Sequence, residues 1–120
     1  MVSSNSVNFS SSGTADDSME LETITDSPDL LIRRMTLAAG EAMYWHSDAC
    51  RRFTVVVRGT RLGIEYRDGE RIEFAVAPGE VGWDEPETRV HRAVNLGDEP
   101  YEEVVTFYRD APNQVPQPRA

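Results

Sequence analysis

The chain alternates hydrophobic and polar positions over short stretches. Residues 31–37 show the pattern first, where two sets of positions interleave: Leu31, Arg33, Met35 and Leu37 alternate with Ile32, Arg34 and Thr36. Successive side chains of a strand point to opposite faces, so a period of two predicts a β-strand here. Further short runs predict strands at residues 42–46, 53–57, 62–66, 72–74, 81–83, 90–95 and 102–108.

Glycine, proline and aspartate separate these runs. Asp68-Gly69 lies between 62–66 and 72–74, and Asp-Gly favours a hairpin because both residues tolerate positive φ. Pro78-Gly79 marks another turn. No stretch shows a convincing helical pattern. Closely spaced short strands that are separated by such turn residues predict an all-β sandwich or barrel.

The chain divides into one domain and two tails. Residues 1–18 are crowded with serine and poor in apolar side chains, so we interpret them as a flexible tail. Residues 19–111 carry the strand pattern and form the predicted domain. Residues 112–120 are rich in proline and are expected to be an extended tail. A length of 120 residues suits one domain.

Charge and composition exclude several classes of function. The net charge is −9, all 12 basic residues are arginine, and lysine is absent. The acidic balance argues against a nucleic-acid-binding protein and against a polybasic membrane-surface protein. Without lysine there is no Schiff base and no P-loop. Cys50 is the only cysteine, so no intrachain disulfide forms. With no long apolar run and no signal-peptide pattern, we expect a cytoplasmic protein.

Two segments, residues 40–59 and 78–95, contain the only two histidines of the sequence. In the first, five residues separate Gly40 from His46, and six separate Arg52 from Gly59. In the second, Pro86, His91 and Asn95 follow one another with four and then three residues between. Any chemistry based on histidine must therefore use one of these segments.

These spacings resemble the two sequence motifs of the cupin superfamily. The resemblance covers roughly residues 30–110 and implies a double-stranded β-helix, or jelly-roll, barrel. In that family two His and a Glu of the first motif and a His of the second hold a metal. The matching positions here are His46, Asp48, Arg52 and His91. Thr88 also replaces a motif glycine, and Gly79 lies one residue too early.

Arg52 is the departure with the largest consequence. A permanent cation cannot replace an anionic ligand, and at about 4 Å from another unit charge it costs several kcal/mol at an effective dielectric of about 20. Arg52 could pair with Asp48 and fill an abandoned metal site. It could instead bind the carboxylate or phosphate of a small ligand. In that interpretation Tyr44, His46, Trp83 and His91 complete the ligand-binding site.

Three functions therefore stay open. The first is a small-molecule-binding protein with a degenerate metal site and an anionic ligand held by Arg52. The second is a metal-dependent enzyme, an oxygenase or isomerase, that uses His46, Asp48 and His91. No cofactor is strongly implied, and this second function would require a divalent ion such as Fe, Mn, Ni or Zn. The third is a structural or assembly dimer with a filled barrel. A homodimer is expected in each case, because dimerisation would cover sheet edges.

Overall fold

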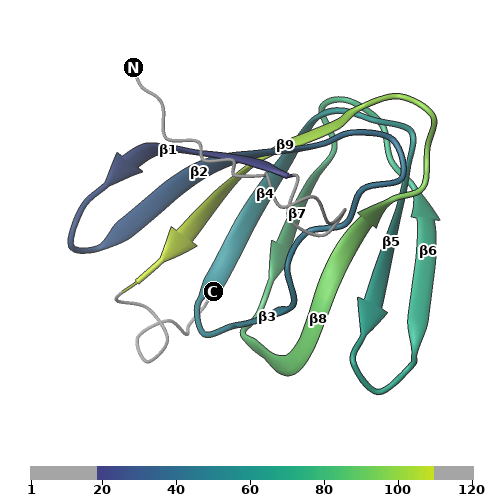
Figure 1. The fold of residues 1–120 in the computed structure, drawn as a ribbon. Helices are drawn as coiled ribbons and strands as arrows, with labels where there is room; N and C mark the ends of the chain where they lie inside the picture. The colour runs from purple at the N-terminus through teal and green to yellow at the C-terminus, as the bar shows by residue number, and fades with distance from the viewer. Residues whose placement is uncertain (1–18, 110–120) are drawn as a thin grey trace.

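The computed structural model describes residues 19–109, which form nine strands in two antiparallel sheets (Figure 1). The predicted tails, 1–18 and 112–120, lie outside the described residues. The strands are β1 (Glu20–Asp26), β2 (Leu30–Leu37), β3 (His46–Asp48), β4 (Arg51–Arg58), β5 (Arg61–Tyr66), β6 (Arg71–Ala75), β7 (Val81–Asp84), β8 (Glu87–Asn95) and β9 (Tyr101–Tyr108). Within the described range there is no helix long and apolar enough to cross a membrane.

The two sheets interleave strands that are distant in the sequence. One sheet has the order β1-β2-β9-β4-β7 and the other the order β3-β8-β5-β6 (Figure 1). Side chains alternate between the two faces of a sheet. The buried core takes Met35, Val56 and Tyr101 from one sheet and Leu62 and Ala93 from the other. The predicted all-β jelly-roll architecture is confirmed.

The predicted strands are found with small changes at their ends, and two differences stand out. β1 was not predicted separately; it pairs with β2 at the edge of its sheet and is largely exposed, so its hydrophobic signal is weak. The expected strand at 42–46 is wrong in its bounds. Only an isolated bridge joins Ala42 to Val94, and the strand proper is His46–Asp48.

The predicted turns are confirmed. Gly69 has a φ of +105°, and the backbone N–H of Tyr66 donates to the carbonyl of Glu70 at 2.8 Å to close the hairpin. Gly79 has a φ of +90°, and its N–H donates to the carbonyl of Val56 at 2.8 Å. This second turn therefore fixes the start of β7 against β4.

The barrel interior has an apolar end and a polar end. The apolar end contains the core residues Met35, Leu37, Val56, Leu62, Ala93 and Tyr101. The polar end contains Arg52, four residues before Val56 on β4, and His91, two residues before Ala93 on β8. Most of the burial that stabilises the fold therefore lies away from the charged residues.

Asn95 ties the loop between β8 and β9 to the apolar end. Its side chain is fully buried, and its Nδ2 donates to the carbonyls of Leu37 at 3.1 Å and Glu99 at 2.8 Å. Its Oδ1 accepts from the N–H of Gly97 at 2.9 Å. Both donors and the acceptor of the amide are thus satisfied, which a buried polar group requires.

We predict that Gly59→Ala destabilises the barrel more than Gly69→Ala does. Both glycines have positive φ, +135° and +105°, so alanine at either costs about 1–2 kcal/mol in backbone strain. A Cβ on Gly59 would also lie 2.7 Å from Cδ1 of Tyr101, whereas one on Gly69 meets nothing within 4 Å. The clash should lower the free energy of unfolding, measured with urea, by a further amount of about 1–3 kcal/mol. Equal losses of unfolding free energy in the two variants would contradict this prediction, because they would show that β4 and β9 can move apart at this point without cost.

Candidate metal and ligand site

A cavity of about 580 Å³ lies between the sheets and reaches the polar end of the barrel. His46 and Asp48 are two residues apart on β3 and point to the same side of it. His91 on β8 pairs directly with His46 in the antiparallel register. Pairing of these two short strand segments therefore brings both histidines of the chain to one place.

Three potential metal ligands converge at this place. The ligand atoms of His46, Asp48 and His91 all lie within 4.8 Å of one another. Asp48 Oδ2 is 3.0 Å from His91 Nε2 and 3.5 Å from His46 Nε2. The side chains of Asp48 and His91 are each 9% exposed, and that of His46 is 19% exposed. The group is sheltered from water but borders the cavity.

Backbone carbonyls fix the orientation of both imidazoles. His46 Nδ1 lies 3.0 Å from the carbonyl oxygen of Tyr44, and His91 Nδ1 lies 2.8 Å from that of Arg89. A carbonyl only accepts, so each Nδ1 carries the proton in these bonds. In a neutral imidazole the Nε2 then presents a lone pair, here toward a carboxylate oxygen. The lone pair and the carboxylate oxygen repel each other, and a proton or a metal ion between them removes this repulsion.

The pKa values of His46 and Asp48 shift in the directions that favour an ion pair between them. Burial would lower the pKa of His46, but hydrogen bonds to Asp48 and to the Tyr44 carbonyl outweigh it, and the pKa is raised. Burial would raise the pKa of Asp48, but the hydrogen bond to His46 and the charge of Arg52 outweigh it, and the pKa is lowered. The site therefore favours a negative Asp48 beside a cation.

Arg52 lies beside the same carboxylate. Its Nη1 is 3.3 Å from Asp48 Oδ2, its Nη2 is 3.7 Å from Asp84 Oδ2, and the side chain is 14% exposed. Nη1 also donates a long hydrogen bond of 3.5 Å to the carbonyl of Glu85. Of the two arrangements left open by the sequence, the structure has the pairing with Asp48. Arg52 points into the barrel, but two carboxylates already offset its charge.

No protein-family model matches the sequence, and no curated protein matches it. Many solved structures match the fold. A cupin domain from Bordetella pertussis superposes with a TM-score of 0.64 and 17% identity, over 72% of this chain and 88% of that one. A predicted oxalate decarboxylase from Thermotoga maritima gives 0.59 and 14%, over 75% and 79%. The chain has the cupin fold. A sugar phosphate isomerase of the cupin superfamily from Silicibacter pomeroyi gives 0.60 and 20%, over 79% and 62%.

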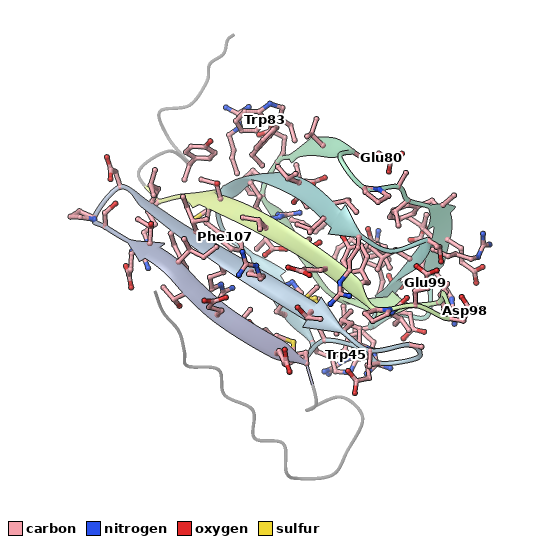
Figure 2. The ribbon with its side chains drawn as sticks, turned by 90° about the horizontal axis from the view of Figure 1, so that it is seen from above. Trp45, Glu80, Trp83, Asp98, Glu99 and Phe107 are labelled. Carbon is pink, nitrogen blue, oxygen red and sulfur yellow. The ribbon has the colours of Figure 1, made fainter. Side chains whose placement is uncertain are left out.

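Two aromatic residues were predicted to line a ligand site, and of these only Tyr44 borders the cavity. Its ring meets the His46 ring edge-on, with centroids 5.4 Å apart. Trp83 is instead 55% exposed and lies on the outside of the barrel (Figure 2). Its ring stacks on Tyr108, and the guanidinium of Arg51 lies over it. Its predicted place in the site is wrong, because Gly82 and Asp84 line the cavity and the intervening residue must face outward.

The cavity also contains charged residues that the sequence pattern did not indicate. Arg33 on β2 and Glu103 on β9 both line it. The signal that could have found them is a charged residue on the hydrophobic face of an alternating run. Arg33 shares its face with Met35 and Leu37, and Glu103 shares its face with Val105.

The surroundings of Glu103 shift its proton equilibrium toward the neutral form. Burial raises its pKa, and the hydrogen bond from Tyr101 and the charge of Arg52 only partly oppose this effect. The Tyr101 hydroxyl donates to Glu103 Oε1 at 2.6 Å, and burial also raises the pKa of Tyr101. The cavity wall therefore favours the neutral form of this carboxyl group, because isolated buried charges are costly.

We predict that Glu103→Gln raises the melting temperature at pH 8 and changes it little at pH 4. Unfolded Glu103 ionises near its ordinary pKa of 4.5, while the folded residue ionises only at higher pH. The folded state therefore loses stability as the pH rises through that window, and glutamine removes the loss. Glu102→Gln is the control, because Glu102 faces outward and pairs with Arg34 and Arg58. The melting temperature of the Glu102→Gln protein should not rise at pH 8. A Glu103→Gln protein that melts lower than wild type at pH 8 would contradict the assignment.

Proposed function

We propose that the protein binds one divalent transition-metal ion through His46, Asp48 and His91, and binds a small anionic molecule in the adjoining cavity. The observation that carries this proposal is the convergence of three acceptor atoms within 4.8 Å. The carbonyl bonds at both Nδ1 atoms leave each Nε2 free as a ligand. Histidine ligands of metals are commonly oriented by such a second hydrogen bond.

The donor set fits first-row metals. Two imidazole nitrogens and one carboxylate form a ligand set used by Fe(II), and imidazole also suits Zn, Ni and Cu. Three protein ligands leave coordination positions open on the side of the cavity. When bound, such an ion acts as a Lewis acid toward an oxygen atom of a second molecule.

The size of the cavity supports a ligand over a filled structural barrel. A volume of about 580 Å³ falls inside the range of roughly 300–1,000 Å³ found for small-molecule sites. The polar groups at one end would orient the ligand, and apolar side chains such as Val56 and Leu62 would contact its remainder. An anionic ligand is in line with the compounds in the names of two similar structures, a sugar phosphate and oxalate. Homodimerisation and a cytoplasmic location remain predictions.

The test is a titration of metal-free protein with Co(II), followed by visible absorption and calorimetry. We expect one ion per chain for wild type. Asp48→Asn and His91→Ala should each weaken binding more than 100-fold, since even indirect partners of a metal are worth about 10–100-fold. Asp84→Asn is the matched control, because Asp84 lines the same cavity and pairs with Arg52 but is not one of the three ligands.

Two results would contradict the proposal. One is wild-type protein that binds no metal. The other is equal weakening by Asp48→Asn and Asp84→Asn, which would indicate attraction by the general negative charge of the cavity and not coordination by the three residues.

We further predict that Arg52→Gln tightens Co(II) binding about tenfold or more. Arg52 competes for the carboxylate oxygen of Asp48 from 3.3 Å and repels a nearby cation. Calorimetry measures the change. Weaker binding in Arg52→Gln would show instead that Arg52 is needed to position Asp48.

A further inference from the structure

We propose that Arg33 binds the anionic group of the molecule in the cavity, so that this molecule carries a carboxylate or phosphate apart from the group that faces the metal site. This inference rests on the proposed function and specifies its ligand. It also assigns to Arg33 the role that the sequence suggested for Arg52.

Arg33 faces the cavity from β2, the second strand of the five-stranded sheet. It lies in register with Val105 on β9, which is in turn in register with Thr54 on β4. Arg33, Val105 and Thr54 all line the cavity. The row that contains Arg52 and Phe107 lies two residues further along. Both arginines therefore project from the same wall.

The guanidinium of Arg33 extends over a neighbouring aromatic ring. Its Cζ lies 5.0 Å from the centroid of the Phe107 ring, which is in register with Arg52 (Figure 2 labels Phe107). A contact of this kind holds the guanidinium beside the ring and leaves its N–H groups able to form hydrogen bonds. The group is thus oriented toward the polar end of the cavity before any ligand is present.

Arg33 differs from Arg52 in its partners. Among residues 19–109, these two are the arginines that line the cavity, and Arg52 pairs with Asp48 and Asp84. Arg33 forms no ion pair within that range, and its Nε is buried without a hydrogen-bond partner. Buried polar atoms are normally paired, and a buried donor left alone is destabilising. An anionic ligand would supply the missing partner.

The chemistry of the guanidinium defines the ligand class. Its planar fork matches the two oxygens of a carboxylate or phosphate, with which it forms paired charge-assisted hydrogen bonds. The metal site lies across the cavity, with β3 and β8 in the opposite sheet. A molecule that reaches both must have two oxygen-bearing groups on a short chain. Small dicarboxylates and phosphorylated hydroxy compounds belong to this class.

The experiment measures binding of succinate and of inorganic phosphate by calorimetry, with metal-free and Zn(II)-loaded protein. We expect Arg33→Gln to weaken binding of at least one probe about ten- to 100-fold, as expected for hydrogen bonds to a charged group. Arg33→Lys, which keeps the charge but not the fork, should fall between Arg33→Gln and wild type. The probe that depends on Arg33 distinguishes a carboxylate ligand from a phosphate ligand.

Arg34→Gln is the matched control. Arg34 is the next residue on β2, but it points to the outer face and pairs with Glu22 at 2.8 Å and Glu102 at 3.1 Å. Its loss should leave binding of both probes within about twofold of wild type, because it does not line the cavity. Circular dichroism confirms that each variant is folded.

Two results would overturn the inference: neither probe binds to wild type, or Arg33→Gln binds as wild type does. A parallel Co(II) titration separates this failure from failure of the proposed function. Metal binding without an Arg33 effect would refute only the role of Arg33. Arg33-dependent binding of a probe to a protein that takes no metal would refute only the metal site.

Discussion

One carboxylate oxygen, Oδ2 of Asp48, organises the polar end of the barrel. Two imidazole nitrogens and one guanidinium nitrogen approach it within 3.5 Å, from β3, β8 and β4. Asp48 therefore joins both sheets at this end. Its charge also needs a cation, because burial without compensation would cost several kcal/mol. The arrangement of His46, His91 and Arg52 around it meets that requirement.

The opposite, apolar end of the barrel stabilises the fold that holds Asp48 and its neighbours in place. The apolar end holds the buried side chains of Leu37 and Tyr101, and Asn95 secures the loop beside them. The close approach of Tyr101 to Gly59 joins β9 to the end of β4. Because stability resides mostly at that end, the polar end can keep a cavity and a partly unsatisfied arginine, features that a tightly packed core would exclude.

Local patterns predict the strands well, since period-two alternation and the turns at Asp68-Gly69 and Pro78-Gly79 depend on neighbouring residues. Motif spacing also identified His46, Asp48 and His91, which the structure brings together. The sequence alone does not show which side chains become partners across neighbouring strands. Arg52 meets Asp84 because β4 pairs with β7, and that register arises only in the folded sheet. Trp83 was misplaced for a related reason: its residue type suggested a pocket, but the pleat of a four-residue strand turns it outward.

The most direct measurement of the central claim is the position of a bound ion in crystals grown with Co(II), located by anomalous diffraction at the cobalt edge. The account predicts one peak at about 2.0–2.3 Å from Nε2 of His46, Nε2 of His91 and the carboxylate of Asp48. It also predicts that both Nδ1 atoms keep their bonds to the carbonyls of Tyr44 and Arg89. An ion held elsewhere in the cavity, or Asp48 still paired with Arg52 and no ion beside it, would contradict the account.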